Sequence, residues 1–281
     1  MTLLRLPHAR PTVILFDWHA TLVDTKDAMY HAVDDVLPKL VDTGLIERLV
    51  KAEDSKTVED AKLVKYVRAH HRLHPRIKLE RKISRTDIFE LLFGADEQAK
   101  REAHRLFDAS YRQHFGEIEP LEPEARTHLQ ALQALGVRLG VLSNRSREFM
   151  EREIDTIDGT GWRALFETMV CGDDVAARKP APDLLLKALA DLGVAPGPGC
   201  WYVGDSTTDV VAAKLAQVTS IFYNGAGWDR NWIDRIFPGT VRHPHQPDGV
   251  IRDLPELLRT VRLFLDGVSG DGKPGTGTSA G

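Results

Sequence analysis

The sequence predicts an α/β fold in which helices cover both faces of a parallel sheet and a helical domain is inserted into the chain. Three observations lead to this prediction: short apolar segments typical of buried strands, helical patterns between them, and one long region without a strand. The apolar segments lack clean polar alternation, which indicates strands buried on both faces. In such sheets, functional loops lie at the carboxyl ends of the strands.

The predicted strands are rich in β-branched or aromatic residues. They are Thr12–Phe16, Val137–Leu142, Thr168–Cys171, Cys200–Val203 and Val218–Phe222. Helical patterns lie between them, and the two clearest are Glu122–Leu135 and Pro182–Leu192. Each of these two is followed by a glycine, which favours the end of a helix, and then by a strand.

Residues 26–120 interrupt this alternation, because they carry only helical patterns. These patterns cover Ala28–Leu40, Val58–Arg72, Arg85–Leu92 and Glu97–Tyr111. We therefore predict a core made of residues 11–25 and 121–266, with residues 26–120 inserted as a helical domain over the strand ends. Residues 267–281 are almost wholly Gly, Ser, Thr and Pro, which predicts a disordered tail.

The composition excludes several classes of protein. A formal net charge of −4, with 42% hydrophobic and 28% charged residues, is typical of a globular protein. A mildly acidic chain lacks long-range attraction for nucleic acid or an anionic membrane, so we expect neither partner. Cys171 and Cys200 match no metal or redox spacing, and no segment resembles a signal peptide or a membrane span. The expected location is cytoplasmic, and the oligomeric state is not predicted.

Acidic residues follow two of the predicted strands. Asp17 follows the first strand, and Asp205 and Asp209 follow the fourth, four residues apart across a strand-to-helix turn. Two carboxylates at this spacing can point at one cation, and oxygen ligands suit Mg²⁺ better than zinc. Capping of the following helix explains one of these acids more readily than two.

Two further strand ends offer groups that bind an anion. Ser143 and Asn144 follow the second strand at a helix start, together with main-chain N–H groups. Lys179 follows the third strand just before a proline-rich helix start, where its charge can point inward. The four strand ends therefore bring together three acids, a hydroxyl and a lysine.

These segments resemble the motifs of haloacid dehalogenase-like hydrolases, which are mostly Mg²⁺-dependent phosphatases. The matching segments are FDWHATLVDT (16–25), VLSN (141–144), RKPAPD (178–183) and VGDSTTD (203–209), in the family's order. The resemblance implies a Rossmann-like core with a cap inserted after the first motif, as in the phosphoglycolate phosphatase and phosphonatase branches. It also implies a Mg²⁺ cofactor and a small phosphorylated metabolite as substrate.

The resemblance further implies roles for individual residues. Asp17 would attack phosphorus and form an aspartyl-phosphate. Ser143 would bind phosphoryl oxygens, and Lys179 would hold the nucleophile and the phosphate together. Because the substrate and Asp17 repel each other, Mg²⁺ and Lys179 would neutralise that charge. The full expected site comprises the catalytic residues Asp17 and His19, the substrate-binding residues Ser143, Asn144 and Lys179, and the metal ligands Asp17, His19 through its backbone carbonyl, Asp205 and Asp209.

His19 marks the sharpest departure from the family's pattern, and the helical insert matches the cap position without an identifiable cap sequence. Phosphatases of the family usually carry a second Asp two residues after the nucleophile, where it acts as general acid and base. An imidazole with an ordinary pKa of about 6.5 can protonate a leaving alkoxide and later activate water, so we expect His19 to take this role. The competing interpretation is an inert His19 and a substrate that leaves without acid help.

Three other functions stay open at this point. Phosphonoacetaldehyde hydrolases share an FDWxxT opening, but they need a cap lysine for a Schiff base. The available lysines are Lys56, Lys62, Lys65, Lys78 and Lys82. Haloacid dehalogenases dispense with Mg²⁺ and replace the acids of the fourth motif, whereas Asp205 and Asp209 are present here. A non-catalytic binding module is the third alternative, suggested by the altered residue at position 19.

Overall fold

The computed structural model describes residues 7, 9–55, 57–80, 85–237 and 245–266, and these form two compact units. The first unit lies within residues 1–23, 120–155 and 160–281, and the second within residues 24–119 and 156–159. Among the described residues, no helix combines the length and apolar character needed to cross a membrane. The predicted tail, residues 267–281, lies outside the described residues.

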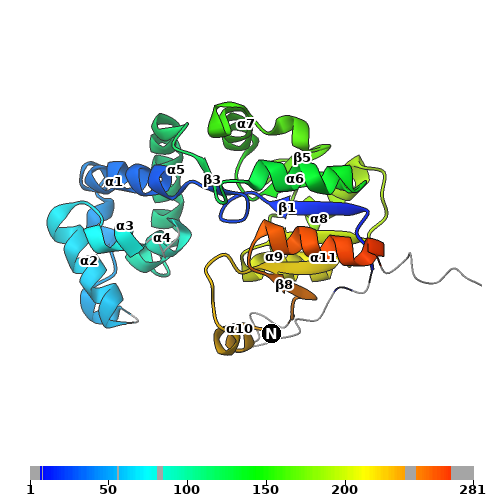
Figure 1. The fold of residues 1–281 in the computed structure, drawn as a ribbon. Coiled ribbons are helices and arrows are strands. Elements are labelled where there is room, and N and C mark those ends of the chain that lie inside the picture. Colours follow the sequence, from blue (N-terminus) through cyan, green and yellow to red (C-terminus); the bar gives the residue numbers. More distant parts are fainter. Residues whose placement is uncertain (1–6, 8, 56, 81–84, 238–244, 267–281) are drawn as a thin grey trace, which may run out of the picture. The chain divides into compact units, whose positions relative to one another are not determined.

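The first unit is built on a six-stranded sheet whose order is β5-β4-β1-β6-β7-β8 (Figure 1). Its strands are β1 (Val13–Asp17), β4 (Arg138–Ser143), β5 (Thr168–Cys171), β6 (Cys200–Gly204), β7 (Thr219–Tyr223) and β8 (Gly249–Ile251). All neighbouring strands are parallel, which confirms the predicted α/β fold. The five predicted strands form within one residue of their expected bounds, and β8 is an additional strand.

Helices cover both faces of this sheet. They are α6 (Ala125–Ala134), α7 (Arg147–Thr156), α8 (Asp183–Asp191), α9 (Thr207–Leu215), α10 (Arg230–Ile236) and α11 (Leu254–Asp266). Leu15 of β1 packs in one apolar cluster with Leu184 of α8 and Ala212 of α9. Because side chains alternate along a strand, Phe16 faces the opposite side, and it is also fully buried. Helices α6 and α11 lie side by side in the same unit (Figure 1).

The second unit is helical. Its helices are α1 (Lys26–Asp42), α2 (Val58–His70), α3 (Pro75–Glu80), α4 (Arg85–Phe93) and α5 (Glu97–Tyr111). Helix α1 packs beside α5 (Figure 1). Phe89 of α4 meets Phe107 of α5 edge-on, with ring centroids 6.4 Å apart. The short strands β2 (Val23–Asp24) and β3 (Glu119–Pro120) pair where the chain passes between the units. The assignment of residues 26–120 as a cap stays a prediction.

Candidate active site

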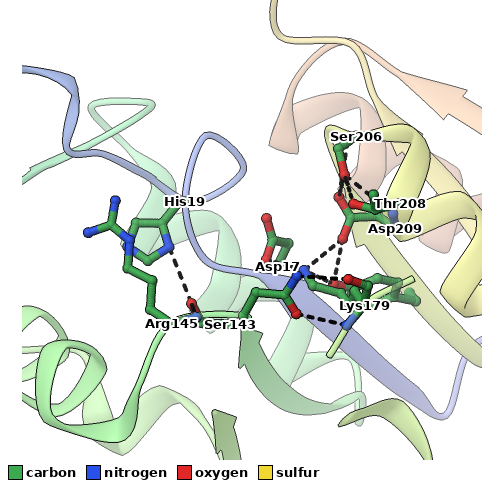
Figure 2. Close-up of polar contacts among 10 residues, drawn as sticks. Asp17, His19, Ser143, Arg145, Lys179, Ser206, Thr208 and Asp209 are labelled. Carbon is green, nitrogen blue, oxygen red and sulfur yellow. Dashed lines mark hydrogen bonds and ion pairs between the residues drawn. The ribbon is translucent and has the colours of Figure 1, made fainter. Parts of the chain in front are cut away.

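The sheet places Asp17 in the middle of its carboxyl edge. Asp17 is the last residue of β1, which lies between β4 and β6. The register pairs Phe16 with Val141 of β4 and Val203 of β6, so the three strands end at nearly the same level. The loops that follow β1, β4 and β6 therefore start close to the Asp17 carboxylate (Figure 2).

Lys179 binds the nucleophile candidate directly. Its Nζ donates to Oδ1 of Asp17 at 2.5 Å, to Oδ1 of Asp209 at 2.7 Å and to the hydroxyl of Tyr202 at 2.8 Å. Burial by itself would lower the pKa of the Lys179 ammonium, but the charges of Asp17 and Asp209 outweigh burial and hold that pKa above its ordinary value. Lys179 is therefore a charged anchor whose N–H donors are all engaged within the protein (Figure 2).

Tyr202 is a site residue that the sequence did not reveal, because it lies inside a strand that reads as apolar. Its hydroxyl accepts from Lys179 and donates to Oδ1 of Asp209 at 2.9 Å. The ring is 1% exposed, so this hydroxyl has no bulk water to bind. Tyr202 therefore fixes the distance between the ammonium and the Asp209 carboxylate.

Asp209 uses its two oxygens for two different tasks. Oδ2 accepts from the backbone N–H of Ser206 at 3.0 Å, and the Ser206 hydroxyl oxygen accepts from the N–H of Asp209 at 3.3 Å, which forms a capping box at the start of α9. The Ser206 hydroxyl also donates to Oδ2 at 2.5 Å. Oδ1 accepts from Lys179 (Figure 2). It also accepts from the hydroxyl of Tyr202. Asp209 thus caps α9 and also contacts Lys179, and its role as a metal ligand stays a prediction.

Gly204 makes room for this arrangement. A Cβ added at position 204 would lie 2.5 Å from Cγ and 2.6 Å from Cβ of Asp209, far inside a normal contact. Only glycine therefore allows the end of β6 to approach Asp209 this closely.

Three carboxylates converge at this edge of the sheet. Oxygens of Asp17, Asp205 and Asp209 all lie within 4.8 Å of one another. Burial raises the pKa of Asp17 to about 6, with Lys179 opposing the rise and Asp209 adding to it. Burial, and then the charges of Asp209 and Asp17, hold the pKa of Asp205 well above its ordinary value. The ammonium of Lys179 does not balance this negative charge, and an all-oxygen set of this kind fits Mg²⁺.

His19 lies on the other side of Asp17 and is bound by a buried acid, Glu153 of α7. Nε2 of His19 is 2.8 Å from Oε2 of Glu153, and the indole N–H of Trp18 donates to the same oxygen at 2.9 Å. Nη1 of Arg145 donates to Oε1 at 3.2 Å. Glu153 is 2% exposed, so these donors replace the water that a carboxylate needs.

The second ring nitrogen of His19 faces the predicted phosphate-binding hydroxyl. Nδ1 is 3.3 Å from Oγ of Ser143, which also accepts from the backbone N–H of Arg145 at 3.1 Å (Figure 2). Burial, followed by the charge of Arg145, lowers the pKa of His19 to about 4, although Glu153 opposes the change. The imidazole is therefore neutral at pH 7 in the free protein. Its acid–base role and the metal contact of its carbonyl stay predictions.

Asn144 has a different contact from the predicted one. Its side-chain Nδ2 donates to the backbone carbonyl of Lys179 at 3.0 Å, and its Oδ1 accepts from the backbone N–H of Lys179 at 2.9 Å. This reciprocal pair ties the loop after β5 to the end of β4. Asn144 thereby positions Lys179, and its predicted contact with substrate stays a prediction.

Sequence reasoning also missed Glu153, although a signal was present. Glu153 falls at helical spacing on the buried face of α7 that includes Phe149, Met150 and Ile154. A carboxylate on such a face must find partners inside the protein.

Comparison with known proteins identifies the family and the fold. The family model for haloacid dehalogenase-like hydrolases matches residues 11–217. Phosphoglycolate phosphatase of Escherichia coli strain K12 is 32% identical over 169 residues, which cover 60% of this chain and 62% of that protein. Phosphoglycolate phosphatase of Colwellia psychrerythraea is 29% identical over 211 residues, or 74% of this chain and 82% of that protein. The match to the E. coli protein thus spans less than two thirds of its length.

Solved structures share the fold. CbbY from Rhodobacter sphaeroides, solved in complex with phosphate, is 20% identical with a TM-score of 0.54 and covers 90% of this chain and 99% of that chain. A HAD-superfamily hydrolase from Geobacter sulfurreducens is 19% identical with a TM-score of 0.54 and covers 89% of this chain and 96% of that chain. The matching sheet, the ordered motifs and the family match over residues 11–217 together show that this chain belongs to the haloacid dehalogenase-like hydrolase family.

Proposed function

We propose that this chain is a Mg²⁺-dependent phosphatase that hydrolyses a small phosphorylated metabolite through an aspartyl-phosphate on Asp17. The observation that carries the proposal is the buried cluster in which Lys179 binds both Asp17 and Asp209, with Asp205 close by. The phosphoglycolate phosphatases among the relatives favour a phosphate ester as substrate, and phosphoglycolate is the first one to test.

In the proposed reaction, a carboxylate oxygen of Asp17 attacks phosphorus. The bond from phosphorus to the ester oxygen breaks, and its electron pair leaves with the alkoxide, which takes up a proton. Water then attacks the phosphorus of the aspartyl-phosphate, which releases inorganic phosphate and restores the Asp17 carboxylate. In the free protein Lys179 holds Oδ1 of Asp17 at 2.5 Å, so the nucleophile is oriented before the substrate arrives.

Charge is the main obstacle to this reaction, because a phosphate dianion and a carboxylate repel each other. Lys179 reduces the repulsion through its contact with Asp17. Mg²⁺, when held by Asp17, Asp205 and Asp209, would add positive charge at the phosphoryl oxygens. Lys179 reaches a substrate oxygen only if it gives up one of its present partners, so its first role is to position Asp17.

His19 is the proposed proton donor to the leaving alkoxide. The imidazole is neutral in the free protein, but a phosphate dianion beside Ser143 raises the pKa of His19, because negative charge favours the imidazolium. Glu153 favours the same charged form and holds the ring in place through Nε2. His19 and Glu153 together would thus supply the function of the single Asp that the family usually has at position 19.

No observation favours the alternative reactions. Cleavage of a C–P bond needs a lysine that forms a Schiff base, and two of the lysines considered, Lys56 and Lys82, lie outside the described residues. Dehalogenation is disfavoured by the presence of both Asp205 and Asp209. The cytoplasmic location and the absence of nucleic-acid and membrane partners stay predictions.

The test is a phosphate-release assay on the full chain with p-nitrophenyl phosphate and phosphoglycolate. We expect turnover with Mg²⁺, none after removal of the metal with EDTA, and none in Asp17→Asn. The matched control is Asp191→Asn, which removes an exposed acid paired with Lys187 on α8 and leaves activity unchanged. An inactive wild type on a broad panel of phosphate esters with Mg²⁺ would rule out the phosphatase. A lysine adduct trapped by borohydride with phosphonoacetaldehyde would instead establish C–P cleavage.

A further inference from the structure

A second group of potential metal ligands lies in the helical unit, within residues 24–119. His31 and Asp35 lie one turn apart on α1, and His114 and Glu117 follow α5. Ligand atoms of His31, His114 and Glu117 lie within 4.8 Å of one another. These residues take no part in the proposed reaction.

The imidazoles of His31 and His114 both direct Nδ1 toward the carboxylate of Glu117. Nδ1 of His31 is 2.6 Å from Oε2 of Glu117, and Nδ1 of His114 is 2.9 Å from Oε1 of Glu117. The two rings come from segments more than 80 residues apart in the chain and lie with centroids 5.5 Å apart. Two nitrogens and a carboxylate therefore meet at one point.

The outer contacts of this group also resemble those of a metal site. Nε2 of His114 is 2.7 Å from Oδ2 of Asp35. A histidine that binds a metal through one nitrogen commonly donates its other N–H to a carboxylate, which fixes the ring and its tautomer. Asp35 already holds His114 in this way, with Nδ1 directed at the point where the ligands meet.

The local backbone favours the same arrangement. The N–H of Glu117 donates to the carbonyl of His114 at 3.2 Å, so the chain turns back on itself between them. Gly116 within this turn has φ of 101°, a value that glycine adopts readily. The two ligands from this segment are thereby held next to each other.

We infer that His31, His114 and Glu117 form a binding site for a transition-metal dication such as Zn²⁺, with Asp35 as the outer carboxylate. Imidazole nitrogens favour zinc-like ions over Mg²⁺ and Ca²⁺. With zinc bonds of about 2.1 Å, neighbouring ligand atoms lie about 3.4 Å apart, which small side-chain movements achieve here. A dication with Glu117 and Asp35 is electrically neutral when both imidazoles are neutral. The metal would take the place of a proton on each Nδ1.

Solvent can reach the site. The side chains of His31 and Glu117 are 51% and 38% exposed, so a metal can enter and water can complete its coordination. The inference is independent of the phosphatase proposal, because it concerns different residues in a different unit.

The test uses Co²⁺ as a spectroscopic probe of the full chain, after removal of bound metal and with excess Mg²⁺ present to occupy the acidic site. We expect one Co²⁺ per chain with the visible absorption of a four- or five-coordinate ion, displaced by Zn²⁺. His31→Ala and Glu117→Gln should each weaken binding by more than about tenfold, and Asp35→Asn by about tenfold. The matched control is His70→Ala, which removes an exposed histidine whose ring lies tilted against that of Tyr66 in the same unit, and it leaves binding unchanged.

Thermal unfolding with and without Zn²⁺ provides a readout that does not depend on the spectrum. Zinc should raise the Tm of the wild type and of His70→Ala, but not that of His31→Ala. Unchanged Co²⁺ affinity in His31→Ala, or no Co²⁺ binding by a folded wild type, would overturn the site. Phosphate release from p-nitrophenyl phosphate, measured on the same samples, reports separately on the phosphatase.

Discussion

Replacement of Glu153 by glutamine tests the buried network around His19. The substitution keeps the shape of the side chain but removes its charge and one acceptor oxygen. In the wild type, both oxygens accept hydrogen bonds, from Trp18, His19 and Arg145, and the residue is 2% exposed. An amide NH₂ in place of one oxygen faces an N–H donor and leaves it without an acceptor.

The magnitude follows from the loss of one partner in a buried charged network. Such a loss costs about 3–5 kcal/mol, and a hydrogen bond to a charged group is worth about 1.5–3 kcal/mol. Arg145 is 17% exposed and can turn to water, which places the effect at the lower end. We expect Glu153→Gln to lower the free energy of unfolding by about 3 kcal/mol.

The assay is urea unfolding followed by tryptophan fluorescence, because Trp18 contacts Trp162 edge-on at 6.0 Å and both rings are fully buried. The matched control is Glu151→Gln on the same helix. Glu151 is 46% exposed and lies 3.4 Å from Arg147, an arrangement worth about 0.3–0.5 kcal/mol. Equal losses of stability in the two variants would refute the argument that Glu153 anchors the loop after β1.

Three further predictions concern the site and its surroundings. Gly204→Ala should push Asp209 aside by about 1 Å and reduce turnover about 100-fold, whereas Gly197→Ala, where an added Cβ meets nothing within 4 Å, should leave turnover unchanged in the same phosphate assay. His19→Ala should slow a substrate with a poor leaving group about 100-fold and p-nitrophenyl phosphate far less, and equal slowing of both would argue against a proton donor. Burial raises the pKa of Cys171 to about 12, because it disfavours the thiolate. The contribution of the protonated thiol to the free energy of unfolding is therefore complete below pH 9 and is lost as the pH rises through 12. Native protein at pH 8 should therefore leave this thiol unmodified by iodoacetamide, and rapid labelling would contradict its burial.

The sheet could be predicted because its central strands are apolar along their whole length. The residues of Val13–Phe16 and Trp201–Val203 are at most 1% exposed, and burial on both faces leaves an almost continuous apolar run in the sequence. The strand Gly249–Ile251 is only three residues long and begins with glycine, so it carries too little pattern to separate it from a loop. Its place at the edge of the sheet is set by pairing with β7, which is a tertiary contact.

The site could be predicted as far as it follows from the ends of strands. Asp17, Ser143 and Asp205 come together because parallel strands end at one edge of the sheet. This arrangement does not depend on the conformation of the loops that follow the strands. Tyr202 and Glu153 could not be placed in this way. Each acts through a polar atom at the end of an otherwise buried side chain, and its partners come from segments that are distant in the sequence.

The contacts of Lys179 and those of Glu153 involve one short segment of chain, Asp17 to His19. Asp17 binds Lys179, and the next two residues, Trp18 and His19, both bind Glu153. The segment then turns back, because the N–H of Leu22 and that of Val23 both donate to the carbonyl of Trp18. Glu153 therefore fixes not only the imidazole but also the loop that carries the nucleophile. A histidine at position 19 is compatible with an ordered site because the buried carboxylate of Glu153 holds its imidazole at Nε2.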